Sequence, residues 1–174
     1  NPYFLVIQHP VTSEIDLSKT QIEVTLRAIE HSGINALIIL PNNDAGYSSI
    51  VKKVQNSSIK SVKSLSISDY VNLLRHSNGL IGNSSSGIHE AASFNVPVVN
   101  IGTRQQGRLR PSNVIDVGHD LVEIASAIQQ CKEIKKNKTN FKNPYGDGRS
   151  AYRIVDLLKK IEIGEKIVQK RITY

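Results

Sequence analysis

The chain has 174 residues, of which 39% are hydrophobic and 21% are charged, and its formal net charge is +7. This length and composition are typical of one soluble globular domain, and no apolar stretch is long enough to predict a membrane span. The single cysteine, Cys131, excludes an internal disulfide and cannot form a zinc site alone, so we expect a reducing, cytoplasmic location.

Most of the positive charge lies near the end of the chain. Twelve of the 22 lysines and arginines follow residue 131, where five acidic residues accompany them. No aromatic residues alternate with these bases in the manner of an RNA-binding surface. We therefore interpret them as a solvated basic face and expect no nucleic-acid partner, with docking to a weakly anionic surface as the alternative.

Methionine is absent from the chain. A natural open reading frame starts with methionine, and asparagine at the second position does not usually favour its removal. We therefore expect the chain to be part of a longer protein.

Hydrophobic periodicity predicts strands and helices in alternation along most of the chain. In chain order we expect a strand over 3–8, a helix over 17–31, a strand over 35–40, a helix over 47–55, a weaker strand over 59–65, a helix capped by Ser68, a strand over 79–82, a helix after the serine-rich turn, strands over 96–101 and 114–117, a helix over 121–136, and a last helix that carries Ile154, Val155, Leu158 and Ile161. Gly33 should end the first helix, and Asp147 should cap the last one.

Unbroken apolar strands that alternate with helices predict a parallel sheet with helices on both faces, which is a Rossmann-like α/β fold. His9, Asn42 and Ser84 each directly follow a predicted strand. Because the carboxyl ends of parallel strands meet at one edge of the sheet, we expect these three residues to share the ligand-binding edge.

The segment GNSSSGIHE (82–90) has the composition of an anion-binding turn. Free backbone N–H groups and small hydroxyls at a helix N-terminus are suited to a phosphate or diphosphate. Glu90 follows Ser84 by six residues, where its carboxylate could accept hydrogen bonds from a sugar diol without facing the phosphates. The pattern therefore predicts a nucleotide with a ribose and a diphosphate.

Four segments in this order resemble the C-terminal domain of the hydrolysing UDP-N-acetylglucosamine 2-epimerases, and they are QHPVTSE (8–14), PNNDAG (41–46), IGNSSSGIHEAASFNVPVVNIGTRQQGR (81–108) and NPYGDG (143–148). The non-hydrolysing relatives carry a serine-glycine-glycine turn and a TERPE-like segment at the corresponding places, which favours the hydrolysing branch. The resemblance implies that residues 1–174 form a single UDP-binding domain, the C-terminal half of a two-domain GT-B architecture. The N-terminal catalytic domain would then be absent from this chain.

The resemblance also implies site residues. His9 corresponds to a histidine on the diphosphate side, whose protonated imidazole would stabilise or protonate the departing UDP. The expected substrate-binding residues are Asn42, Ser84, Ser85, Gly87, Glu90 and Arg104. Each of these residues also has an ordinary structural alternative, such as turn formation, helix capping or a surface charge.

In the reaction that the resemblance implies, UDP leaves by anti elimination to give a 2-acetamidoglucal, and water then adds to give N-acetylmannosamine. This product would enter the synthesis of sialic or related nonulosonic acids. No cofactor is expected, and the histidines and carboxylates show no spacing suited to a metal. We expect the chain alone to be inactive and the full-length protein to be a homo-oligomer.

Three alternatives stay open at this point. The substrate could be a UDP-2,4-diacetamido-trideoxyglucose, as in the legionaminic acid pathway. A GT-B glycosyltransferase would share the fold, although the segment GTRQQGR argues against it. A non-catalytic UDP-sugar-binding module is the third alternative, because the expected catalytic carboxylates lie outside the chain.

Overall fold

The structure is a computed structural model, and it describes residues 1–164 and residue 169. The chain divides into two compact units, Asn1–Pro144 and Tyr145–Tyr174, and we describe each by itself. The first unit contains the sheet, so the expectation of a UDP-binding domain concerns this unit, and its extension over residues 1–174 stays a prediction. The basic residues Lys166, Lys170 and Arg171 lie outside the described residues.

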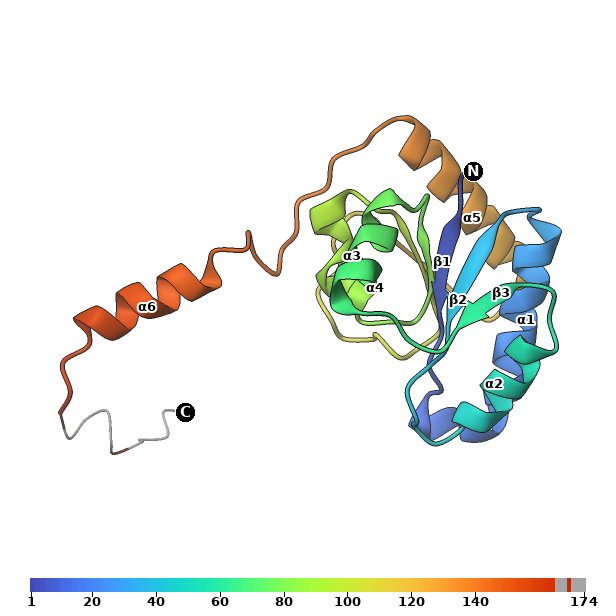
Figure 1. The fold of residues 1–174 in the computed structure, drawn as a ribbon, viewed down its shortest axis with the longest axis horizontal. Helices are drawn as coiled ribbons and strands as arrows, with labels where there is room; N and C mark the ends of the chain where they lie inside the picture. The colour runs from blue at the N-terminus through green and yellow to red at the C-terminus, as the bar shows by residue number, and fades with distance from the viewer. Residues whose placement is uncertain (165–168, 170–174) are drawn as a thin grey trace. The chain divides into compact units, whose positions relative to one another are not determined.

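Six parallel strands form one sheet in the first unit (Figure 1). The strands are β1 (Phe4–Ile7), β2 (Ala36–Ile39), β3 (Lys60–Val62), β4 (Leu80–Gly82), β5 (Val98–Ile101) and β6 (Val114–Val117). Their order across the sheet is β3-β2-β1-β4-β5-β6, and every neighbouring pair is parallel. The strand order reverses between β1 and β4, which is where sheets of this class bind ligands.

Helices cover both faces of the sheet, as predicted (Figure 1). The helical segments of the first unit are η1 (Thr12–Leu17), α1 (Ser18–His31), α2 (Tyr47–Gln55), α3 (Ile67–His76), α4 (Ser86–His89), η2 (Ala91–Phe94) and α5 (Leu121–Lys136), of which η1 and η2 are 3₁₀ helices. On one face α1 packs against α2 and α5, and on the other face α3 and α4 pack against η2. The predicted Rossmann-like α/β fold is therefore confirmed.

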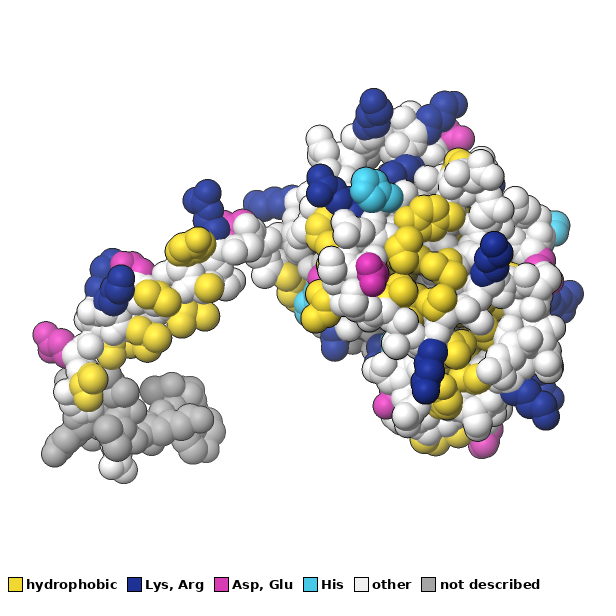
Figure 2. Space-filling model, viewed as in Figure 1, with side chains coloured by type: hydrophobic (Ala, Val, Ile, Leu, Met, Phe, Trp, Pro, Cys, Tyr) yellow, Lys and Arg dark blue, Asp and Glu magenta, His cyan; other side chains and the backbone are white. Residues whose placement is uncertain are grey.

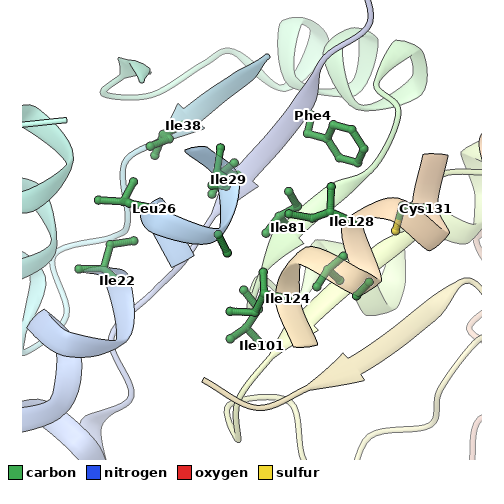
Figure 3. Close-up of a cluster of buried hydrophobic side chains, with 14 of the residues drawn as sticks. Phe4, Ile22, Leu26, Ile29, Ile38, Ile81, Ile101, Ile124, Ile128 and Cys131 are labelled. Atoms are coloured by element: carbon green, nitrogen blue, oxygen red, sulfur yellow. The ribbon is translucent and has the colours of Figure 1, made fainter. Parts of the chain in front are cut away.

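The side chains of β1 enter two separate hydrophobic clusters. Phe4 and Val6 belong to the larger cluster with α1 and α5, which Figure 3 shows, whereas Leu5 and Ile7 belong to the cluster on the opposite face. Because a strand alternates its side chains, burial on both faces requires an unbroken apolar run. Cys131 is fully buried in the larger cluster, and burial raises the pKa of its thiol to about 12.

The N-cap of α3 is Ser66, so the prediction of Ser68 was wrong. The hydroxyl of Ser66 accepts a hydrogen bond from the Asp69 amide at 3.1 Å and donates one to the Asp69 carboxylate at 2.7 Å. The first of these bonds satisfies a free N–H group at the helix start, and the second orients the hydroxyl for it. Ser68 lies inside the first turn, and the strand predicted over 59–65 is limited to Lys60–Val62.

The helix predicted after the serine-rich turn is short. α4 ends after four residues, Glu90 departs from helical dihedral angles, and the chain continues as η2. Asn95 then takes a left-handed conformation with φ of 53°, from which the chain turns back toward β5. The first helix, in contrast, ends as predicted, with Gly33 at a φ of 57°.

The second unit contains α6 (Ser150–Lys160), whose apolar residues are exposed. Figure 2 shows hydrophobic side chains along one side of this helix, and they include Ile154, Val155, Leu157 and Leu158. Asp147 does not occupy the N-cap position itself, which belongs to Arg149. Its carboxylate instead accepts hydrogen bonds from the Arg149 amide at 3.1 Å and from the Arg153 guanidinium.

The contact between β1 and β4 depends on the absence of a side chain at Gly82. A Cβ atom at this position would lie 2.1 Å from the carbonyl oxygen of Ile7, and Gly82 has a φ of 123°. Both the close approach and the dihedral angle exclude other residues without a shift of the backbone. Gly82 therefore fixes the carboxyl ends of the two strands at which the site lies.

We predict that Gly82→Ala lowers the free energy of unfolding by at least about 2 kcal/mol, because the new methyl group meets backbone atoms of β1. Urea denaturation followed by circular dichroism measures this change. Gly118→Ala is the matched control, because its Cβ would meet only the flexible Glu123 carboxylate, at 3.3 Å. Equal stability of the two variants would contradict the prediction.

Candidate active site

Asn83 joins three of the segments that meet at the carboxyl edge of the sheet. Its side-chain oxygen accepts a hydrogen bond from the His9 amide at 2.7 Å, and its side-chain nitrogen donates to the His9 carbonyl at 2.9 Å. Its own carbonyl accepts hydrogen bonds from the Arg104 guanidinium at 3.2 Å and the Gln105 side chain at 2.7 Å. The loop after β1, the turn after β4 and the loop after β5 are therefore bound together.

The His9 ring is buried and uncharged at neutral pH in the ligand-free chain. His9 is 8% exposed, and burial lowers the pKa of its imidazole to about 4, with a further decrease from Arg104 and a smaller opposing effect of Asp44. The Asn42 amide donates to the ring Nδ1 at 3.4 Å, so the ring proton lies on Nε2. The neutral ring thus has its N–H donor at Nε2, whereas the resemblance implies a protonated imidazole.

Arg104 is partly buried at the same edge. Burial lowers the pKa of its guanidinium, the Asp44 carboxylate raises it, and Arg108 lowers it. Arg108 itself is exposed and lies 2.6 Å from the His89 ring. The guanidinium of Arg104 is therefore held in place by the Asn83 carbonyl with a carboxylate nearby, which leaves its charge available to an anion.

The serine-rich turn places small hydroxyl groups beside Asn83. The Ser84 hydroxyl accepts a hydrogen bond from the Ser86 amide at 3.3 Å, and the Ser84 carbonyl accepts one from Gly87 at 3.1 Å. A Cβ atom at Gly87 would lie 2.8 Å from the Val98 side chain. Gly87 therefore allows α4 to pack closely on β5, and its expected role beside a ligand stays a prediction.

Glu90 is exposed at the end of α4, and Ser86 connects this helix to α3. The Tyr70 hydroxyl on α3 forms a hydrogen bond with the Ser86 hydroxyl. Burial raises the pKa of Tyr70, the bond to Ser86 opposes this, and the negative charge of Glu90 adds to the increase. The electrostatic effect indicates that Glu90 and Tyr70 lie close together, with the Glu90 carboxylate facing solvent.

A cavity of about 580 Å³ opens among the loops at this edge, where its lining begins at Pro10. Its lining includes Ser13, Glu14, Asp44, Thr103 and Arg104, so the loops after β1, β2 and β5 all contribute. The Glu14 carboxylate accepts hydrogen bonds from Thr103 at 2.5 Å and from Gln21 at 2.6 Å, which lower its pKa. The lining thus includes a cation and two carboxylates, a combination suited to a polar ligand with anionic and hydroxyl groups.

The structure brings His9, Asn42, Ser84 and Arg104 to one edge, as the position of these residues after the strands predicts. Of the expected site residues, Arg104 lines the cavity, whereas His9, Asn42, Ser84, Ser85, Gly87 and Glu90 are not part of its lining, and Glu90 lies at the far end of α4. Contact of these residues with a substrate stays a prediction.

Sequence reasoning missed Asn83, Tyr70 and Glu14. The sequence contains a signal for Asn83, because Asn83 is the first residue after β4 and so has a position similar to that of His9 shortly after β1. Tyr70 carried only the helical spacing of an apolar residue, and Glu14 lies in η1, which was not predicted.

The described part of the chain lacks the features of two other kinds of site. No group of three or more His, Cys, Asp or Glu side chains there could hold a metal ion. No helix among residues 1–164 combines the length and the apolar character needed to cross a membrane.

Comparison with known proteins gives concordant matches. The family model for UDP-N-acetylglucosamine 2-epimerases matches residues 1–159. A UDP-N,N'-diacetylbacillosamine 2-epimerase (hydrolysing) from Legionella pneumophila is 36% identical over an alignment of 170 residues, and the match covers 95% of this chain and 45% of that protein. A UDP-N-acetylglucosamine 2-epimerase from Neisseria meningitidis is 33% identical over 173 residues, 97% of this chain and 46% of that protein.

The fold is shared with solved epimerase structures. The crystal structure of UDP-GlcNAc 2-epimerase from Neisseria meningitidis, bound to UDP-GlcNAc, matches with a TM-score of 0.73 at 20% identity. The match covers 92% of this chain and 46% of that one. The chain therefore spans about half the length of the relatives that it matches.

We predict that the free energy of unfolding falls as the pH decreases from about 6.5 to about 4. The folded state keeps His9 neutral until about pH 4, whereas the unfolded chain binds the proton near the ordinary pKa of 6.5, so protons favour unfolding in this window. The lowered pKa of His119 acts in the same direction.

Urea denaturation at several pH values measures this dependence. His9→Asn should reduce the change of the free energy of unfolding between pH 6.5 and pH 4. In His119→Asn the contribution of His9 to this change should remain. A slope unaffected by His9→Asn would show that the ring is not neutral in the folded state.

Proposed function

The chain belongs to the UDP-N-acetylglucosamine 2-epimerase family, and we propose that it is the C-terminal, UDP-binding half of a hydrolysing member. The proposed reaction converts UDP-N-acetylglucosamine and water to N-acetylmannosamine and UDP. The observation that carries the proposal is the joining of His9, the serine-rich turn and Arg104 by Asn83 at the edge where parallel sheets bind nucleotides.

We propose that the diphosphate binds between His9, Arg104 and the serine-rich turn. Nε2 of the neutral His9 ring is a hydrogen-bond donor, and Arg104 supplies a positive charge. The hydroxyl groups of Ser84 and Ser85 would donate to phosphate oxygens, with Asn42 as a further contact. A bound diphosphate would raise the pKa of His9, because an adjacent negative charge favours the protonated ring.

In the proposed reaction the bond between C1 of the sugar and the UDP oxygen breaks while the proton on C2 is removed, which gives a 2-acetamidoglucal. Water then adds across this double bond. Negative charge develops on the diphosphate as UDP leaves, so donors already in place would stabilise the transition state more than the substrate. The base for the C2 proton would come from a part of the protein outside this chain.

We further propose that the protein acts in the cytoplasm, needs its N-terminal domain for turnover and forms a homo-oligomer at full length. Its product would enter the synthesis of sialic or related nonulosonic acids. Support for a further domain comes from the length of the relatives, of which the chain spans about half.

We predict that the chain binds UDP more tightly than UMP or ATP, and that Glu90→Ala weakens UDP binding by about 1–3 kcal/mol because charge-assisted hydrogen bonds to the ribose are lost. Isothermal titration calorimetry measures both effects. Glu133→Ala, on the exposed side of α5, is the control and should bind UDP as the wild type does.

Unchanged UDP affinity in a folded Glu90→Ala variant would reject the ribose assignment. If the wild-type chain binds none of the three nucleotides, titration of the full-length protein with UDP decides whether the N-terminal domain is needed for binding. Absence of UDP binding there would overturn the proposed function.

We predict that His9→Ala in the full-length protein lowers kcat more than it weakens UDP binding, because the His9 hydrogen bond strengthens as charge develops on the leaving UDP. Release of UDP from UDP-N-acetylglucosamine is the assay, with UDP-N,N'-diacetylbacillosamine as a second substrate. Equal losses in turnover and affinity would mean that His9 only positions the diphosphate.

A further inference from the structure

Asn83 uses every hydrogen-bonding group that it has except one side-chain hydrogen. Its amide donates to the Ile7 carbonyl at 3.1 Å, its side chain pairs with both backbone groups of His9, and its carbonyl accepts from Arg104 and Gln105. The bonds to His9 join positions 74 residues apart in the sequence. The side chain of Asn83 thus holds both the amide and the carbonyl of His9, and so fixes the backbone that carries the His9 ring.

Burial makes these bonds costly to lose. Asn83 is 1% exposed, and Gln105 is also 1% exposed. A buried amide or carbonyl that loses its partner does not regain one from water unless the structure opens. Loss of the Asn83 side chain would therefore release the His9 backbone and admit solvent to its ring.

Asn83 is 1% exposed and therefore offers almost no surface of its own to a ligand. Its carbonyl instead faces Arg104 and Gln105, and its side chain faces the His9 backbone. An effect of Asn83 on ligand binding would therefore pass through His9 and Arg104.

We propose that Asn83 is a positioning residue, which holds the His9 ring and the Arg104 guanidinium in one fixed arrangement for the diphosphate. The geometry supports this role because the side chain of Asn83 holds the His9 backbone, and the backbone carbonyl of Asn83 holds the Arg104 guanidinium. Pre-organisation of this kind improves binding because the donors need not be ordered when the ligand arrives. This inference rests on the proposed function only in taking a diphosphate as the ligand.

Asn113 provides a matched control. It is a fully buried asparagine whose side chain also donates to a backbone carbonyl, that of Val96, at 2.7 Å. It precedes β6 and therefore lies at the amino edge of the sheet, opposite the candidate site. Asn113→Ala removes a comparable buried hydrogen bond without contact to His9 or Arg104.

The test compares Asn83→Ala and Asn113→Ala in the 174-residue chain by two measurements. Calorimetric titration with UDP should show affinity reduced at least about tenfold in Asn83→Ala and unchanged in Asn113→Ala. NMR titration of the His9 ring should show its pKa rising from about 4 toward the ordinary value of 6.5 in Asn83→Ala only. Loss of stability alone would affect both variants and would not move the His9 titration.

A folded Asn83→Ala variant with wild-type UDP affinity, or with an unchanged His9 pKa, would overturn the inference. If the wild-type chain does not bind UDP, the proposed function is in doubt, but the His9 titration still tests the positioning role. If Asn83→Ala does not fold, Gln105→Met takes its place, since it removes a donor to the Asn83 carbonyl at similar volume. UDP affinity reduced at least about threefold would then support the role, and wild-type affinity would reject it.

Discussion

Gly82 lies so close to Ile7 that a Cβ atom would be 2.1 Å from the Ile7 carbonyl oxygen, and Asn83 follows immediately with its amide bound to that same oxygen at 3.1 Å. The close approach sets the end of β4 against the end of β1. Asn83 can reach both backbone groups of His9 only because this spacing is fixed. The geometry of the candidate site thus depends on how the parallel strands β1 and β4 end. The positions of the loops that follow these strands depend on it as well.

The ligand-free site combines buried polar groups with a positive charge that is only partly balanced. His9 stays neutral because its ring is removed from water, and Arg104 retains its charge beside Asp44. Desolvated donors of this kind lose little hydration when a diphosphate binds, and their interaction with it is stronger than in water. The carboxylates of Glu14 and Asp44 on the cavity wall restrict where an anion can lie, because they would repel it. These constraints favour one orientation of a diphosphate over others.

The fold could be predicted from the sequence because burial on both faces leaves an unbroken apolar run, as in Phe4–Ile7. The edge of the site could be predicted because polar residues directly follow those runs. Ser66 and Ser68 are chemically alike, so the choice of cap depended on Asp69 reaching back to one of them. The early end of α4 was not predicted, because Glu90, where the chain passes from α4 into η2, is neither a glycine nor a proline that would mark a helix end. The role of Asn83 required knowing that residues 74 positions apart are neighbours.

The strand order has a consequence for how the chain acquires its structure. β1, β2 and β3 pair within the first part of the chain, and β4, β5 and β6 pair within the following part. Only the pairing of β1 with β4 joins these two halves of the sheet, and it closes a long loop at a correspondingly larger entropic cost. The hydrogen bonds between His9 and Asn83 lie just beyond the carboxyl ends of β1 and β4. Both hydrophobic clusters also combine residues from the two halves, so a chain in which only one half has formed would lack the complete core as well as the assembled candidate site.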